Sequence, residues 1–193
     1  MSGDIALSNA RNEVLRKVGR NVVNFARMEA MLKLLNAQQY ISGAVRDLPE
    51  IVAAAKKAAS KRPMGRLADE FVRFVYSESE LKVEQPSDEA SVTFSFRIEA
   101  DKPFSVERKR ALRAVVVERN RLIHQWLPSF DGNSVENCEA FGATLDEQNA
   151  KLLPEFEALR AIVTNLRECQ RELARYLESD AVRAQLEKGI TSA

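Results

Sequence analysis

The residues best suited to chemistry in this sequence lie within six positions of one another, at Arg119, Asn120 and His124. An imidazole can accept or donate a proton at neutral pH, because its unperturbed pKa is about 6.5. A guanidinium stays charged and can hold an oxyanion through two parallel hydrogen bonds. Proton transfer beside a bound anion is therefore the chemistry that these residue types favour.

The spacing of these residues predicts that a helix places them along one flank. Asn120 and His124 are four positions apart, so they share a side of a helix. On a helical wheel Arg119 falls within an apolar stripe, where an unpaired guanidinium costs several kcal/mol. The stripe is formed by Leu112, Val115, Val116, Leu122, Ile123, Trp126 and Leu127. Arg119 therefore needs either a ligand or an internal partner.

Glu29 is the internal partner that the sequence offers to Arg119. It falls among the apolar positions of an amphipathic helix predicted near the start of the chain. A carboxylate at such a position needs a cation or several hydrogen bonds. Two interpretations stay open at this stage, a structural ion pair between Glu29 and Arg119 or an arginine that serves a bound ligand. Asn21 and Asn24 lie near the same stripe and are predicted to form hydrogen bonds between packed helices.

His124 is the only histidine in the chain, and this excludes several kinds of site. A zinc site with two or more imidazoles from one chain is excluded. Cys138 and Cys169 are too far apart in sequence for metal-ligand spacing, and we expect free thiols. Glycine-rich phosphate loops and a Gly-x-Ser-x-Gly elbow are absent from the sequence. We therefore expect no metal and no cofactor.

The periodicity of apolar residues predicts a mainly α-helical fold with a small β-hairpin insertion. Helical spacing covers residues 4–38, 44–61, 63–77, 103–127 and 134–179. The alternation of residues 92–98 predicts a strand, with 81–84 as its hairpin partner within an insertion near 81–99. We expect one domain over residues 1–180, followed by a tail at 181–193.

Composition and charge describe a soluble globular protein. The 193 residues are 45% hydrophobic and 30% charged, and the formal net charge is +1. Because no apolar run approaches 18 residues and no secretory signal is visible, we expect a cytoplasmic protein without a membrane partner. Positive charge is nevertheless concentrated near the chemical segment, and it could attract a polyanion. The RNA-binding candidates are Arg108, Lys109, Arg113 and Arg121.

The segment Arg119-Asn120-Arg121-Leu122-Ile123-His124 resembles the Arg-x4–6-His signature of the HEPN superfamily. Its placement on a late helix, after an amphipathic N-terminal helix and before a further helix, is also similar. Two other segments look like those of bacterial HEPN-like proteins, residues 18–25 leading into Glu29 and residues 64–67. The resemblance covers residues 5–178 and implies an antiparallel helical bundle.

The resemblance implies a metal-independent endoribonuclease. In such enzymes the 2′-hydroxyl attacks the adjacent phosphate and leaves a 2′,3′-cyclic phosphate. Arg119, Asn120 and His124 would then be catalytic and Glu29 supporting. A homodimer would complete the site by supplying a second imidazole. The context would be a toxin–antitoxin system or phage defence, with a possible antitoxin or regulatory protein as partner.

Two other functions are compatible with the same residues. The chain could be a non-catalytic helical module that binds a partner protein or a nucleotide. It could also be an antitoxin or regulator that binds nucleic acid through the basic segment 108–121, with affinity that depends strongly on salt.

Overall fold

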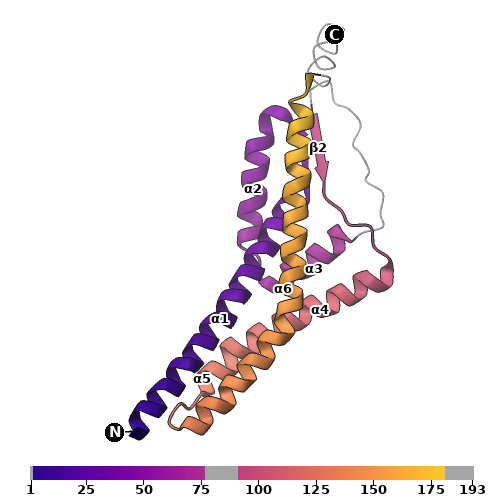
Figure 1. Cartoon of the computed structure of the whole chain (residues 1–193). Helices are drawn as coiled ribbons and strands as arrows, with labels where there is room; N and C mark the ends of the chain where they lie inside the picture. Colours follow the sequence, from indigo (N-terminus) through magenta and orange to yellow (C-terminus); the bar gives the residue numbers. More distant parts are fainter. Residues whose placement is uncertain (1, 77–90, 181–193) are drawn as a thin grey trace, which may run out of the picture. The chain divides into compact units, whose positions relative to one another are not determined.

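The computed structural model describes residues 2–76 and 91–180 of the chain, and Figure 1 labels its six α-helices and β2. The elements are α1 (Ser2–Gln38), β1 (Tyr40–Ala44), the 3-10 turn η1 (Val45–Asp47), α2 (Leu48–Ser60), α3 (Met64–Val75), β2 (Ser91–Ser95), α4 (Lys102–Arg121), the π-helical turn η2 (Leu122–Trp126), α5 (Leu127–Ser129) and α6 (Val135–Leu177). The chain divides into two compact units, residues 1–159 and 160–193.

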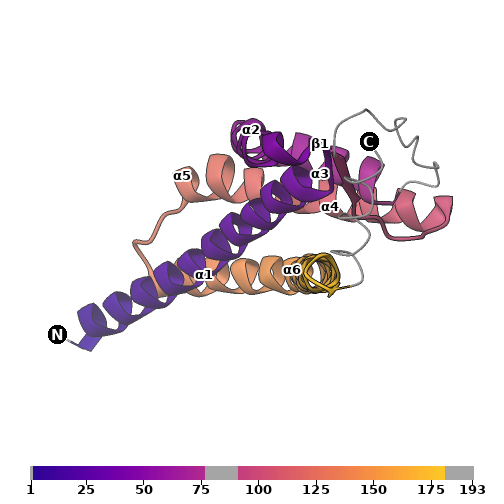
Figure 2. The same ribbon diagram turned by 90° about the horizontal axis from the view of Figure 1, so that it is seen from above.

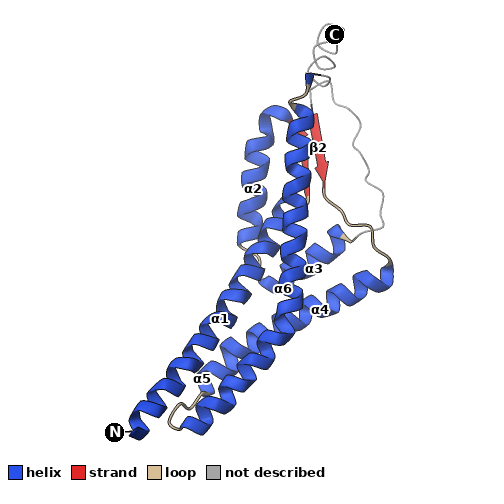
Figure 3. Cartoon of the chain, in the orientation of Figure 1, coloured by secondary structure: helices blue, strands red, loops and turns tan. Residues whose placement is uncertain are grey.

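The predicted mainly α-helical fold is confirmed, and Figure 3 shows how little of the chain is strand. Prolines mark where several helices begin. Pro49 lies in the first turn of α2, and Pro63 caps α3. Proline suits these positions because the first amides of a helix have no intrahelical partner. Asp101 caps α4, since its side chain accepts a hydrogen bond of 2.8 Å from the Phe104 amide.

The small sheet forms from segments far apart in sequence. β2 pairs in antiparallel fashion with β1, in a register that places Ser42 opposite Thr93. The hydroxyl groups of these two residues are 2.8 Å apart. A strand at 92–98 was predicted correctly in type, but its described partner is β1, which the sequence suggested was only a break between helices. The other predicted partner, 81–84, lies outside the described residues, as does the predicted tail at 181–193.

Apolar spacing predicted that Leu15, Phe25, Leu32 and Leu35 share one apolar face of α1, and the last three of these are buried. Leu15 was expected in the core but is 64% exposed, whereas Val14 is 2% exposed. Residues at a spacing of seven, Val14, Asn21, Met28 and Leu35, are all buried. A seven-residue repeat keeps one seam of a long helix against its neighbours. This seam places the polar Asn21 inside the core.

Three helices of the first unit pack around that seam. Contacts between α1 and the beginning of α6 advance together along both helices, from Lys17 with Asp146 to Asn24 with Asn149, so the two helices run parallel (Figures 1 and 2). Contacts between α4 and α6 run in opposite order, from Glu118 with Gln148 to Arg108 with Glu155. α4 is therefore antiparallel to α6.

The second unit, residues 160–193, contains the rest of α6. There an ion pair of 2.7 Å joins Arg175 to Glu172, one helical turn earlier. Across the described parts of both units, no helix is long and apolar enough to cross a membrane.

Candidate functional site

Arg119 and Asn120 lie in the last turn of α4, on its solvent side. Asn120 is exposed and Arg119 is partly exposed. Nη1 of Arg119 donates a 3.0 Å hydrogen bond to Oδ1 of Asn120. The polar side chain that faces the core here is the neighbouring Glu118, which is only 16% exposed. Leu112, Val115 and Leu122 of the predicted stripe are buried, but Arg119, which was expected among them, is partly exposed.

His124 is exposed and lies in the π-helical turn η2 rather than in a regular α-helix. A π turn contains one more residue than an α turn, and single π turns occur often at functional sites. Because a π turn contains more residues, successive residues are separated by a smaller rotation about the helix axis than in an α-helix. The π turn therefore changes the direction of His124 from the one that α-helical spacing predicts. Residues 119–124 are called the Arg119–His124 segment below.

Glu29 does not pair with Arg119. Its Oε1 lies 2.6 Å from Nζ of Lys33, one turn later on α1, and its side chain is 28% exposed. Lys33 therefore satisfies the carboxylate locally, as is common for pairs four positions apart on a helix. The internal ion pair that the sequence suggested for Arg119 was wrong, and the structure gives Glu29 no contact with the Arg119–His124 segment among the described residues.

The four predicted RNA-binding cations are all close to carboxylates. Arg108 makes two hydrogen bonds to Glu155, and Arg113 makes two to Asp69. Lys109 lies 3.9 Å from Asp69, and Arg121 lies 2.8 Å from Glu118. The hydrogen bonds from Arg113 lower the pKa of Asp69 below its ordinary value. Each of these side chains therefore has a carboxylate neighbour, with Lys109 and Arg113 sharing Asp69, and is less available to phosphates than the sequence predicted.

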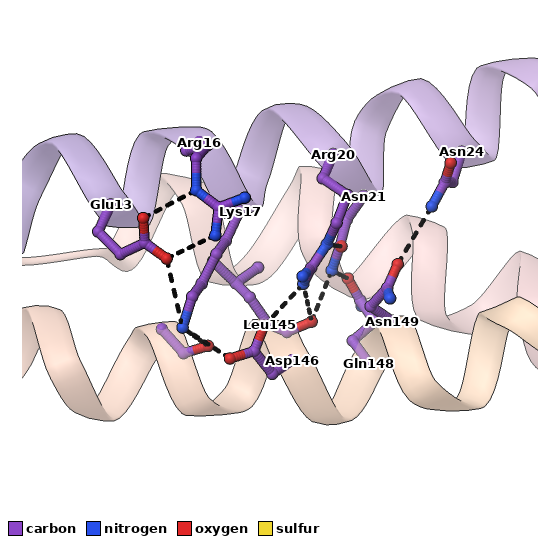
Figure 4. A network of polar contacts seen from close by, with 11 residues as sticks. Glu13, Arg16, Lys17, Arg20, Asn21, Asn24, Leu145, Asp146, Gln148 and Asn149 are labelled. Atoms are coloured by element: carbon purple, nitrogen blue, oxygen red, sulfur yellow. Dashed lines mark hydrogen bonds and ion pairs between the residues drawn. The ribbon is translucent and has the colours of Figure 1, made fainter.

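A buried network of amides, which the sequence analysis missed, lies behind α4. Asn21 is 0% exposed and Gln148 is 1% exposed. Nδ2 of Asn21 donates to Oε1 of Gln148 at 3.1 Å and to the Leu145 carbonyl at 2.8 Å (Figure 4). Nε2 of Gln148 donates to the Glu118 carbonyl at 3.0 Å and to its Oε2 at 3.1 Å. The expected helix-packing role of Asn21 is confirmed.

A sequence signal for Gln148 did exist. Leu145, Leu152 and Leu159 are buried at a spacing of seven, and Gln148 falls at the intermediate position where such repeats carry a second apolar residue. A polar residue at a core position of such a repeat indicates either a hydrogen-bonding partner on a neighbouring helix or a functional site. Only the packing of three helices shows that the partners are Asn21 and Glu118.

Charged residues surround this network where α1 meets α6. Nζ of Lys17 lies 2.6 Å from Asp146, and Nη2 of Arg20 lies 2.9 Å from the same carboxylate (Figure 4). These two hydrogen bonds lower the pKa of Asp146. Arg20 also donates from Nε to Oδ1 of Asn21 at 3.1 Å. The ion pairs and the amides thus hold α1 and α6 in a single register.

Three concave regions in the first unit lie elsewhere. One lies between α3 and α4 beside Tyr76, one between α4 and α6 beside Val115, and one between α1 and α6 beside Cys138. None of these three is lined by the Arg119–His124 segment. Among residues 2–76 and 91–180, no group of three or more His, Cys, Asp or Glu side chains is placed to hold a metal ion.

No family model matches this chain, and neither a curated protein nor a solved structure matches it. The membership in the HEPN superfamily therefore stays a prediction that depends on the residues quoted above.

Proposed function

We propose that the chain is a metal-independent endoribonuclease whose catalytic residues are Arg119, Asn120 and His124. One observation carries the proposal. Arg119 is partly exposed and His124 is exposed, and neither has a carboxylate partner within the described part of the chain. The other predicted phosphate-binding cations of α4 are ion-paired. A cation and an imidazole five positions apart in sequence, neither paired with a carboxylate, are available to a phosphodiester.

In the proposed reaction His124 removes the proton from a ribose 2′-hydroxyl. The 2′-oxygen then forms a bond to the adjacent phosphorus, and the bond from phosphorus to the 5′-oxygen breaks. The products are a 2′,3′-cyclic phosphate and a 5′-hydroxyl. Arg119 neutralises the non-bridging oxygens in the transition state, while Asn120 holds the guanidinium through its existing hydrogen bond.

The leaving 5′-oxygen needs a proton, which a second imidazole would supply. The chain has only one histidine, so we propose that a second copy provides it in a two-fold homodimer. An exposed helix flank does not enclose a substrate, and a second copy packed against it would also form the opposite side of the RNA-binding cleft. In this proposal the protein acts in the cytoplasm as a toxin or a phage-defence nuclease, restrained by an antitoxin or a regulatory protein.

The test is cleavage of assorted RNAs by the purified protein in EDTA, with analysis of the product ends. We expect 2′,3′-cyclic phosphates from the parent and a loss of at least about 100-fold in rate for His124→Gln and Arg119→Ala. Arg110→Ala is the matched control, because Arg110 is an exposed arginine of the same helix. Equal cleavage by folded His124→Gln and parent protein would refute the proposed site.

Dimerisation is tested separately by light scattering after size exclusion. A mass of twice 21.7 kDa is expected in the concentration range where cleavage is seen. Full activity of a strict monomer would contradict the shared site.

The ion pairing of α4 favours a second candidate, a non-catalytic helical module that binds a protein or a nucleotide. The four predicted RNA-binding cations share three carboxylates, Glu155, Asp69 and Glu118, and so form a less open phosphate-binding surface than the sequence predicted. In this case no RNA is cleaved under any condition tested, and Arg119→Ala and His124→Gln behave as Arg110→Ala does.

A further inference from the structure

We propose that Gln148 is a positioning residue for the Arg119–His124 segment. Its buried amide is hydrogen-bonded to both the backbone carbonyl and the carboxylate of Glu118, and it thereby fixes the end of α4 from which the π-helical turn η2, with His124, continues. The effect on cleavage rests on the proposed function, whereas the effect on the geometry of His124 does not.

The amide network leaves Gln148 no freedom to move. Its oxygen accepts from Asn21, and its nitrogen donates twice to Glu118. Asn21 in turn accepts from Arg20 through Oδ1 and donates twice through Nδ2. Every polar atom of the two buried amides thus has a partner. A fully satisfied network in a low-dielectric interior is rigid, because any displacement leaves a buried group without a hydrogen bond.

Glu118 transmits this constraint to the π turn. Its Oε2 is held by Gln148, while its Oε1 accepts a 2.8 Å hydrogen bond from Arg121, the residue just before η2. The guanidinium of Arg121 lies 5.8 Å from the ring centre of Trp126, the last residue of η2. This contact is within the range of a cation–π interaction. A chain of contacts therefore runs from Gln148 across the whole turn that carries His124.

A second contact from α6 holds the far end of the turn. The Trp126 ring packs edge-on against the Phe141 ring, with 6.5 Å between the ring centres. The Phe130 ring stacks on the Phe141 ring, with 4.6 Å between the centres. Phe141 and Gln148 are seven positions apart and so share one face of α6. The same face of α6 thus contacts Glu118, which lies before η2, and Trp126, the last residue of η2.

The π turn needs such support. Isolated π geometry is rare and less favourable than a continuous α-helix, so it persists where surrounding contacts select it. The Glu118 carbonyl accepts from the Leu122 amide as well as from Gln148, at the point where α4 gives way to η2. Without Gln148 this carbonyl and the Glu118 carboxylate lose their fixed partner. We expect the turn to relax and His124 to change its direction relative to Arg119.

The test replaces Gln148 by methionine, which has a similar shape and no hydrogen-bonding amide. The matched control is Asn149→Ala, which removes the 3.1 Å hydrogen bond from Asn24 between the same two helices but does not touch α4. Because the chain has one histidine, its imidazole gives a single set of NMR signals. We expect Gln148→Met to shift these signals and Asn149→Ala to leave them unchanged.

The cleavage assay provides the second measurement. We expect a fall of about 10- to 100-fold in kcat for Gln148→Met, since small misplacements of a reacting group cost that much, with little change in KM. If Gln148→Met does not fold, Glu118→Gln weakens the same chain of contacts while retaining the backbone carbonyl.

The outcomes are distinguishable. Unchanged imidazole signals in folded Gln148→Met and Glu118→Gln would overturn the positioning role, whether or not the parent cleaves RNA. If the imidazole signals shift in Gln148→Met and the parent protein cleaves no RNA, the positioning role is supported and the proposed function is refuted.

Discussion

The pair formed by Arg108 and Glu155 offers the sharpest test of whether the cations of α4 serve stability or RNA binding. Its two hydrogen bonds measure 3.2 and 2.6 Å, and each side chain is only 16% exposed. Arg108→Ala would leave the Glu155 carboxylate mostly buried without its cation. Losing one partner of a fully buried pair costs about 3–5 kcal/mol and of an exposed pair about 0–1 kcal/mol. At this exposure we expect about 2–3 kcal/mol.

Urea unfolding measures this loss. With a slope of about 2 kcal/mol per molar, the midpoint should fall by roughly 1–1.5 M. The single tryptophan, Trp126, and the helical circular dichroism provide two probes, whose coincidence checks that unfolding occurs in one transition. Arg113→Ala is the control, because its pair with Asp69 is 58% and 40% exposed, and it should shift the midpoint far less.

A third variant separates the loss of the attraction between Arg108 and Glu155 from the cost of leaving the Glu155 carboxylate buried without a cation. Arg108→Met combined with Glu155→Leu should recover most of the loss, since apolar residues of similar volume can replace a buried pair. Equal midpoints for Arg108→Ala and Arg113→Ala would refute the reasoning. A fall in RNA affinity without a fall in stability would return Arg108 to the predicted RNA-binding set.

Three further predictions concern the first unit and the thiols. The pKa of Asp146 is lowered by Lys17 and Arg20, so its stabilisation is present above the unfolded pKa and is lost as pH falls through the folded value. The melting temperature of Asp146→Asn should therefore lie below that of the parent at pH 7, and the two should converge below about pH 4; a constant difference would contradict this. Asn21→Ala should cost about 1–3 kcal/mol in thermal unfolding, because it leaves the Gln148 amide oxygen buried without a donor. A loss no larger than that of Asn149→Ala would argue against the network. In the folded protein a thiol reagent should modify exposed Cys169 promptly and buried Cys138 only after denaturation, so a fast count of two thiols per chain would contradict the burial of Cys138.

The helices were predictable because their signals are local. Apolar spacing and the prolines near helix starts depend on neighbouring residues, and these placed most helix boundaries within a few positions. The sheet was not predictable in the same way. The partner of β2 lies some fifty positions earlier in β1, and strand pairing over such a separation depends on how α2 and α3 fold between them.

The facing of each helix was harder to predict than its extent. Successive residues of an α-helix differ by about 100° in direction, so an error of one position moves a side chain away from the core. Val14 is buried where Leu15 was expected, and Glu118 faces the core where Arg119 was expected. Apolar spacing defines a broad stripe, whereas the centre of that stripe is chosen by the neighbouring helices. This is why a carboxylate rather than the guanidinium faces the core beside the Arg119–His124 segment.

The sequence by itself determined which functional groups the chain has: one imidazole, an arginine and an amide within six positions on a late helix, and a mainly helical fold to carry them. Tertiary structure decided which of these groups are free. It paired Arg108 with Glu155, placed Lys109 and Arg113 beside Asp69, and packed Trp126, the last residue of the π turn that carries His124, against Phe141 of α6. The physical reason is that ion pairs and π geometry are selected by contacts between helices, and residue spacing along one helix does not specify its neighbours.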